Sequence, residues 1–117
     1  MANSWRISAL AERHRALGSQ LEDWSGMGTA WTYDKDQKEE YEAIRTKAGV
    51  MDVSGLKKVH ISGPHAQYVI DKATTRNIEK LKPGRSTYAT MLNDAGKFVD
   101  DCVIYRMGPH SFMVVHG

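Results

Sequence analysis

The stretch MLNDAGKFVDDCVIYRM, residues 91–107, decides the fold and holds the most unusual feature of the chain, two adjacent aspartates inside an apolar strand. The pattern predicts the end of one strand, a turn containing glycine, and a long second strand. Because side chains alternate along a strand, one face carries Asp101 and Tyr105 and the other carries Asp100 and Cys102, each pair among valine or isoleucine. Both faces are partly apolar, which favours a position near the middle of a sheet.

The aspartate pair has two interpretations. An ionised carboxylate that is buried without a partner costs several kcal/mol, so at least one of the two must be satisfied. Either one carboxylate caps a loop or pairs with an arginine while the other faces solvent, or the pair faces a polar cavity that holds a ligand. The residues alone leave both interpretations open.

The register of this hairpin determines which side chains accompany Asp101. We expect the turn within residues 92–97 to have two or four residues, which places Tyr88 opposite Val103 and on the same face as Asp101. A turn of three residues would instead place Tyr88 opposite Cys102.

Length and composition predict one small soluble domain over residues 1–117. With 16 basic and 14 acidic residues the charge is nearly balanced and scattered, which argues against nucleic-acid binding. The single cysteine, Cys102, cannot form an internal disulfide and is expected to pack as a small apolar side chain. We find no signal peptide and no membrane span, so a cytoplasmic location is expected.

The first half of the chain predicts two helices around an irregular segment. The helices are expected at residues 8–17, ended by Gly18, and at residues 36–48, with Asp34 as N-cap, Gln37 at the capping-box position and Gly49 as the left-handed terminator. Tyr41, Ile44 and Ala48 fall on one stripe of the second helix, which predicts its buried side. Residues 21–33 combine glycines and tryptophans without a period and are expected to be irregular.

The second half predicts strands around one helix. Strands are expected at residues 50–55, 56–63, 87–92 and 112–117, in addition to the long one, and a helix at residues 64–74 with Tyr68, Val69 and Ala73 inward. This order indicates an α+β fold with a mostly antiparallel sheet and flanking helices. The last strand has no turn or cap after it, so we expect it to be an exposed edge.

Searches for established chemical motifs find nothing. Glycine-rich phosphate loops, zinc-ligand spacings and nucleophile-elbow sequences are all absent. Pattern alone therefore yields an α+β domain with an unexplained acidic pair and no predicted metal.

Four stretches, in order and at family-like spacing, resemble the N-terminal part of the glycine cleavage T-protein family. These are the tetrahydrofolate-dependent aminomethyltransferases and their methyltransferase and demethylase relatives. The stretches are RTKAGVMDVSGLKKVHISGPHA, TRN, LKPGRSTYATMLNDAGKFVDDCVIYRM and FMVV, and the resemblance covers residues 17–116.

The resemblance implies a role for the acidic pair. The second aspartate, Asp101, would face the nitrogens of reduced folate and act there as a general base and electrostatic group. Tyr105 would lie roughly 13 Å from it along the same face, about the span of the pterin. The folate contacts implied by the family are Tyr88, Tyr105, Leu56, Val103 and His116. Ordinary core packing is the alternative role for the two tyrosines.

Two departures from the family pattern bear on the reaction. Glycine-cleaving members usually read DVSHM where this chain has Gly55 and Leu56, and they carry an asparagine at the position of His116. The resemblance therefore favours a relative that takes a methyl group from the oxygen, sulfur or nitrogen of a small molecule, over the aminomethyl reaction.

The resemblance also implies that the domain is incomplete. Family members are much longer, so we expect part of a folate-binding domain that needs a complementing C-terminal portion or a partner chain. That portion is expected to add strands beside residues 112–115 and to cover the Asp101 face. Alone, the chain is expected to bind folate weakly and to self-associate through exposed apolar surface. A non-catalytic folate-binding module, as in relatives that act in iron–sulfur maturation, is the alternative function.

Overall fold

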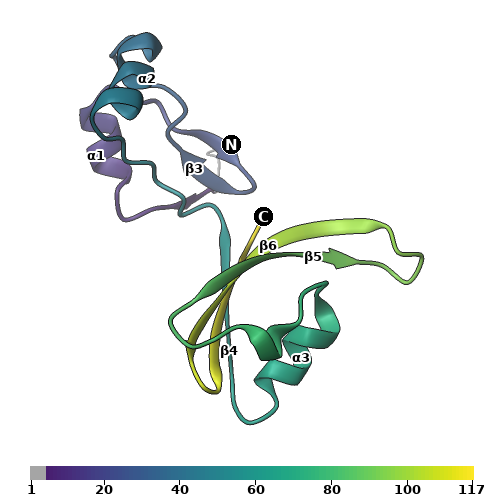
Figure 1. The fold of residues 1–117 in the computed structure, drawn as a ribbon. Coiled ribbons are helices and arrows are strands. Elements are labelled where there is room, and N and C mark those ends of the chain that lie inside the picture. Colours follow the sequence, from purple (N-terminus) through teal and green to yellow (C-terminus); the bar gives the residue numbers. More distant parts are fainter. Residues whose placement is uncertain (1–4) are drawn as a thin grey trace. The chain divides into compact units, whose positions relative to one another are not determined.

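The computed structural model describes residues 5–117 and divides the chain into two compact units, Met1–Gly55 and Leu56–Gly117. Figure 1 shows the elements of each unit, which we describe separately. The expected single domain over residues 1–117 stays a prediction.

The first unit holds a small three-stranded sheet and two helices. Its elements are β1 (Arg6–Ile7), α1 (Ala11–Ala16), β2 (Glu22–Trp24), β3 (Met27–Thr29) and α2 (Gln37–Thr46). Strand β3 is central, antiparallel to β2 and parallel to β1. The prediction of an irregular segment over residues 21–33 was therefore wrong. Ser25 and Gly26 both adopt positive φ, at 51° and 78°, and this two-residue turn joins β2 and β3 where the sequence shows no strand period.

Both helices are shorter than predicted. The N-cap of α2 is Asp36, not Asp34, and its side chain accepts a hydrogen bond from the Lys38 backbone N–H at 3.0 Å. The predicted inward stripe was wrong, because α2 has no buried residue and Tyr41 and Ile44 are 59% and 64% exposed. The helix ends at Thr46, before the glycine that was expected to terminate it.

Residues 50–55 do not form the predicted strand. The Asp52 side chain instead accepts a hydrogen bond from the backbone N–H of Ser54 at 2.9 Å. Such a local side-chain bond competes with strand pairing and favours a turn.

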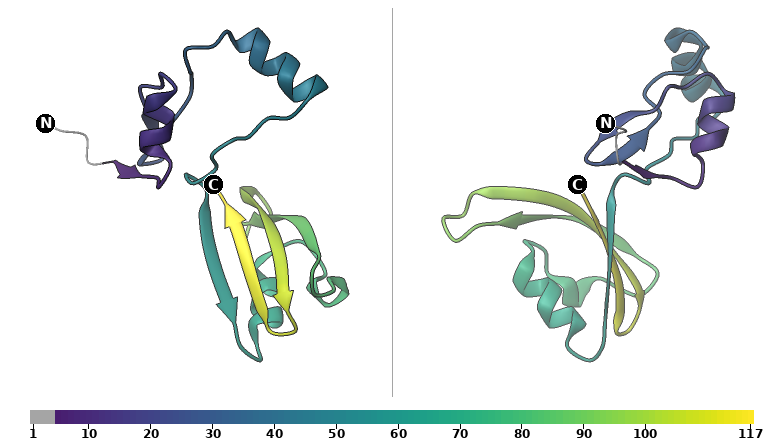
Figure 2. Two further views of the ribbon diagram at one scale, coloured as in Figure 1. Left: turned by 90° about the vertical axis from the view of Figure 1, so that its left-hand side faces the viewer. Right: turned by 180° about the vertical axis from the view of Figure 1, so that it is seen from behind.

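The second unit is a four-stranded antiparallel sheet with helices on one face (Figures 1 and 2). Its elements are β4 (Lys57–Ser62), α3 (Ala66–Ala73), the 3-10 helix η1 (Ile78–Lys80), β5 (Ser86–Leu92), β6 (Phe98–Gly108) and β7 (Ser111–His116). The strand order is β4-β7-β6-β5 and each neighbouring pair is antiparallel. This confirms the predicted α+β class and the inner position of the long strand.

The core of the second unit lies between the helices and this sheet. Its buried side chains are Ala66, Ile70, Ile78, Leu81, Ala89, Cys102, Ile104, Phe112 and Val114. Cys102 is 3% exposed and packs as a small apolar side chain, as predicted. The buried residues of helix α3 are Ala66 and Ile70. The prediction that Tyr68, Val69 and Ala73 face inward was therefore wrong.

Strand β7 is not an edge. It pairs with β4 on one side and β6 on the other, so both the predicted exposed edge and the predicted added strands beside residues 112–115 were wrong. The edges of this sheet are β4 and β5. Part of the β5 edge is covered, because the Thr75 N–H donates to the Thr90 carbonyl at 3.0 Å and Arg76 Nε donates to the Tyr88 carbonyl at 2.8 Å.

The β5–β6 hairpin has the predicted register for a different reason. The Asn93 N–H donates to the Lys97 carbonyl at 2.9 Å, so three residues form the turn and the expected even length was wrong. One extra residue in β6, Val99, then lies between the pairs Leu92↔Phe98 and Met91↔Asp100. This bulge shifts the register by one and places Tyr88 opposite Val103 as predicted.

Among residues 5–117, none of the helices is long and apolar enough to cross a bilayer. The cytoplasmic location stays a prediction.

Candidate functional site

Strand alternation gives the sheet of the second unit two different faces. The face opposite the helices, called the outer face below, carries Tyr88, Asp101, Val103, Tyr105, Met113 and Val115. Tyr88 is 52% exposed and Tyr105 is 37% exposed, while Asp101 and Val103 are half-buried by their neighbours. Four of the predicted site residues therefore share one accessible surface.

Tyr88 and Asp101 are directly bonded on this face. The Tyr88 hydroxyl donates to Asp101 Oδ2 at 2.8 Å, and each residue is held by a neighbouring strand. The hydrogen bond to the carboxylate is the main reason that the pKa of Tyr88 is raised above 10.0. No side-chain hydrogen bond to Tyr105 is found among residues 5–117, which leaves its hydroxyl available to a ligand.

Asp100 points to the other face and has its own partner. His116 Nδ1 lies 3.1 Å from Asp100 Oδ2, and the Asp101 N–H donates to Asp100 Oδ1 at 2.9 Å. The hydrogen bond from His116 is the largest cause of the lowered pKa of the Asp100 carboxyl. Asp100 thus matches the interpretation of a locally paired carboxylate, with histidine in place of arginine, and Asp101 is the member of the pair on the outer face.

The remaining two predicted site residues are placed differently. His116 pairs with Cys102 across β6 and β7, so it lies on the helix-covered face and not beside Asp101. Leu56 is half-buried and lies immediately before β4. Lys58, two positions later in β4, pairs with Val115 of the outer face. The structure brings Asp101, Tyr88, Val103 and Tyr105 together and leaves His116 out of the group.

The outer face combines one carboxylate, two phenols and aliphatic side chains on a rigid sheet. A carboxylate accepts hydrogen bonds from ring N–H groups, and tyrosine and valine side chains contact the face of a planar ring. Among the described residues, no group of three or more His, Cys, Asp or Glu could hold a metal ion. The arrangement suits a planar, nitrogen-rich ring.

Sequence reasoning missed a second polar cluster, in the first unit. The buried His14 has Nε2 at 2.8 Å from Asp52 Oδ2 and Nδ1 at 2.8 Å from the Tyr33 hydroxyl. Ser8 Oγ donates to the same carboxylate oxygen at 2.8 Å. Hydrogen bonds from Ser54, and then from His14 and Ser8, hold the pKa of Asp52 well below its usual range. The sequence signal was the aspartate two residues before a serine, which is typical of a side-chain-bonded turn.

Comparison with known proteins gives the family of this chain. A family model described as GCVT N-terminal domain matches residues 10–117. The chain belongs to this family. The resemblance found in its sequence motifs is thereby confirmed.

Two relatives of this chain have names that describe an enzyme or an enzyme subunit. It is 70% identical over 117 residues to the heme-dependent oxidative N-demethylase gamma subunit of Ectopseudomonas mendocina, covering 100% of this chain and 31% of that protein. It is 36% identical over 110 residues to an aminomethyltransferase of Streptomyces coelicolor, covering 94% of this chain and 29% of that protein. The chain thus spans about a third of the length of these relatives.

A solved structure has the same fold. The glycine cleavage system aminomethyltransferase T from Bartonella henselae superposes with a TM-score of 0.83 and 28% sequence identity, covering 97% of this chain and 32% of that protein. The GCVT N-terminal domain described here is therefore a partial domain of a transferase family.

Proposed function

We propose that this chain is the N-terminal part of an enzyme that transfers a one-carbon unit from a small-molecule donor to tetrahydrofolate, with Asp101 beside the folate nitrogens. The observation that carries the proposal is the bond from Tyr88 to Asp101 on the accessible outer face, at 2.8 Å. The names of the relatives support transfer chemistry over the alternative of a non-catalytic folate-binding module.

The residues of the outer face fit a reduced pterin. Asp101 keeps a carboxylate oxygen without a side-chain donor among the described residues, and this oxygen would accept a hydrogen bond from a ring N–H. Tyr88 holds the carboxylate in one orientation, while Val103 and Tyr105 would contact the ring. Tetrahydrofolate, when bound, supplies the nitrogen that receives the one-carbon unit. Asp101 would accept the proton that this nitrogen loses.

The names of the relatives support a donor class and partner chains for this proposal. One relative has N-demethylase in its name, which favours a donor whose methyl group is bound to nitrogen. This donor belongs to the wider class of oxygen, sulfur and nitrogen compounds. A name that includes gamma subunit supports partner chains, in addition to the portion that the relatives have beyond this chain. The buried His14 uses both ring nitrogens in hydrogen bonds, so it is not free to ligate a heme.

The proposal is tested by Asp101→Asn, which keeps the shape of the side chain and removes its charge. In the protein that also carries the remaining portion, with N-methylated candidate donors, formation of the one-carbon folate product should fall by about 100-fold or more while folding is retained. Asp100→Asn is the matched control, since its carboxylate faces His116, and it should cost much less activity. Equal losses at the two positions would show that the pair is structural and that the proposal is wrong.

A further inference from the structure

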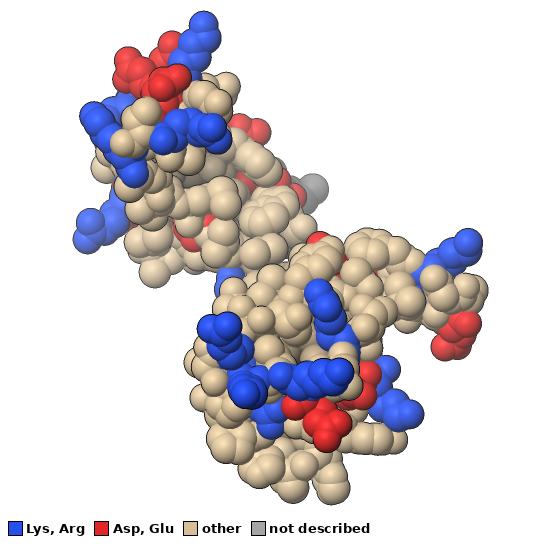
Figure 3. Space-filling view, in the orientation of Figure 1, with Lys and Arg blue, Asp and Glu red and all other residues tan. Residues whose placement is uncertain are grey.

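A pocket in the first unit lies against one side of α1. Four of its lining residues belong to this helix or flank it directly: Leu10, Arg13, His14 and Leu17. Residues spaced three or four apart in this way lie on the same face of a helix. The pocket has a volume of about 390 Å³, which is sufficient for a small molecule. Figure 3 shows lysine, arginine and acidic side chains around the helices of this unit.

Three polar side chains of the pocket are connected by hydrogen bonds. His14 Nε2 is 2.8 Å from the Asp52 carboxylate, and His14 Nδ1 is 2.8 Å from the Tyr33 hydroxyl. An ionised carboxylate only accepts hydrogen bonds, so Nε2 donates to it, and in the neutral imidazole Nδ1 then accepts from the Tyr33 hydroxyl. The Tyr33 oxygen therefore keeps a lone pair that can accept a hydrogen bond from a donor in the pocket.

Three charged side chains that line the pocket, Arg13, Lys35 and Glu40, are not used by the fold. None of the ion pairs and side-chain hydrogen bonds found among residues 5–117 involves their charged groups. Glu40 is close to Tyr33, because its charge is the largest cause after burial of the raised pKa of that tyrosine. The pocket thus has two cations for an anionic group, and two neighbouring acceptors, Glu40 and the Tyr33 oxygen, for a cationic group.

The pocket also has an aliphatic part. Leu10, Leu17 and Val50 line it, and each of them is exposed in the structure without a ligand. An apolar wall with a few polar groups that converge on one space is the usual composition of a small-molecule site. A ligand of this pocket should therefore combine an aliphatic group with one negative and one positive charge.

We propose that this pocket binds a small aliphatic α-amino acid. The carboxylate of the amino acid would accept hydrogen bonds from Arg13 and Lys35, and its ammonium group would donate to Glu40 and to the Tyr33 oxygen. Its side chain would contact the aliphatic part of the pocket. The pocket is formed within the first unit and no outer-face residue lines it, so this binding function goes beyond the one-carbon transfer proposed above.

The test compares L-leucine with two analogues that each lack one of its charges. 4-Methylpentanoate has the same carbon chain without the ammonium group, and 3-methylbutylamine has it without the carboxylate. Each compound is titrated into the full chain, and backbone amide chemical shifts are followed by NMR so that weak binding is measurable. We expect the largest shifts among residues 10–17 and 33–40, and L-leucine should bind about fivefold more tightly than either analogue, as expected for partly exposed charge pairs.

Two variants remove the charged partners and leave the hydrogen-bonded cluster of His14 intact. Arg13→Gln combined with Lys35→Gln should bind L-leucine and 3-methylbutylamine equally, because the carboxylate is no longer recognised. The matched control is Arg45→Gln combined with Lys47→Gln, since both residues are exposed in the same unit and neither lines the pocket. The control should keep the preference of the wild type.

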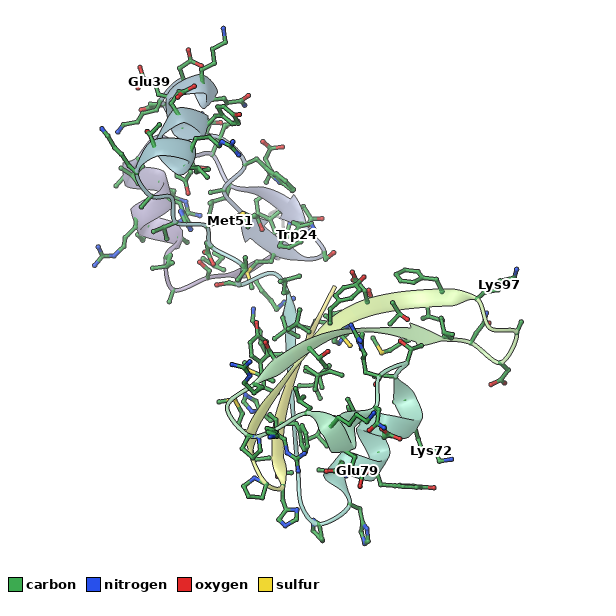
Figure 4. All side chains as sticks on the ribbon, in the orientation of Figure 1. Trp24, Glu39, Met51, Lys72, Glu79 and Lys97 are labelled. Atoms are coloured by element: carbon green, nitrogen blue, oxygen red, sulfur yellow. The ribbon has the colours of Figure 1, made fainter. Side chains whose placement is uncertain are left out.

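Glu40→Gln should lose most of the preference for L-leucine over 4-methylpentanoate. Its control is Glu39→Gln, the neighbouring carboxylate in the first turn of α2, which does not line the pocket (Figure 4). Equal binding of the three compounds by the wild type, or preferences that survive in both pocket variants, would overturn the proposal. Shifts confined to residues 56–117, or no shift with any compound, would overturn it as well and leave the proposed one-carbon transfer standing.

Discussion

Tyr88 and Asp101 meet across two strands, with the tyrosine hydroxyl donating to Asp101 Oδ2 at 2.8 Å on the face opposite the helices. The bond fixes the orientation of the member of the acidic pair that lies on the outer face. Asp100, one residue earlier, is bonded to His116 on the other face. Adjacent residues of the same type therefore have different partners because a strand alternates its faces.

This relationship predicts how Tyr88 titrates. Ionisation of Tyr88 would remove the donated proton and place a phenolate beside a carboxylate, so its pKa lies above 10.0. Asp101→Asn should return the pKa of Tyr88 toward that value, since the carboxylate charge is gone. NMR titration of the tyrosine ring signals measures the change. Asp100→Asn is the control on the opposite face, and an equal decrease in that variant would contradict the assignment of the bond.

The bulge in β6 leads to a second prediction. Val99 is the extra residue between two cross-strand pairs and its side chain is mostly exposed. Deleting Val99 should remove the bulge and keep every pair beyond it, including Tyr88 with Val103. Cross-strand NOEs between these two residues should persist, and the domain should remain folded.

A deletion at Cys102 is the matched control for this prediction. It removes one residue of the same strand beyond the bulge, so Val103, Tyr105 and the rest of β6 would change faces and the core would lose its fit. We expect that variant to unfold. If the Val99 deletion instead places Tyr88 opposite a different residue, the turn and not the bulge determines the register.

The hairpin shows what local pattern can and cannot predict. Apolar alternation along residues 87–92 and the long strand was sufficient to predict both strands and the shared face of Asp101 and Tyr105. The face of Tyr88 was predicted from an even turn length. The three-residue turn and the bulge at Val99 are two changes of register that cancel. The predicted face of Tyr88 is therefore correct, although the turn length from which it was predicted is wrong.

Errors elsewhere involve contacts between residues far apart in sequence. Helix α3 carries apolar side chains on more than one stripe, and the sheet decides that Ile70 and not Val69 is buried. Strand β7 is internal because β4, about fifty residues earlier, pairs along it. His116 and the cluster around His14 are likewise fixed by residues distant in the chain, namely Asp100 and Asp52. The apolar periodicity of one segment does not determine which distant residues that segment will contact.

Gly55 predicts a third outcome. A Cβ atom at this position would lie 2.4 Å from Cε3 of the Trp24 indole, so any side chain requires the rigid ring to move. Gly55→Ala should lower the free energy of unfolding of the first unit by about 1–3 kcal/mol, the usual cost of overpacking. All three tryptophans precede residue 55, so denaturant unfolding followed by tryptophan fluorescence reports on this unit.

Gly108→Ala is the control for crowding, because the nearest atom to its added Cβ would be Ser111 Cβ at 4.0 Å. Neither Gly55 nor Gly108 has a positive φ, so backbone strain does not distinguish the two substitutions. Gly108 lies in the second unit, so this variant is followed by far-UV circular dichroism, and its unfolding should match that of the wild type. A Gly55→Ala variant as stable as the wild type would show that Trp24 moves freely and that the glycine is not required by packing.

The cluster around Asp52 predicts a fourth outcome, a stability difference that depends on pH. Asp52 accepts hydrogen bonds from Ser8 and His14 and from the Ser54 backbone, and these bonds favour the ionised form and lower its pKa. A carboxyl whose pKa is lower in the folded state contributes stability above its unfolded pKa of about 3.9, and this contribution is lost as the pH falls toward the folded value. Asp52→Asn should therefore destabilise the first unit by about 2 kcal/mol at pH 7, the scale of hydrogen bonds to a charged group.

The difference between wild type and Asp52→Asn should stay constant above about pH 5 and shrink as the pH falls below about 4. Urea unfolding followed by tryptophan fluorescence at a series of pH values measures it. Asp34→Asn is the matched control in the same unit, because Asp34 is exposed and its side chain makes no hydrogen bond or ion pair in the described structure; it should change stability little at any pH. A difference for Asp52→Asn that stays the same down to the acid transition would mean that the side chain stabilises the unit by its shape and not by its charge.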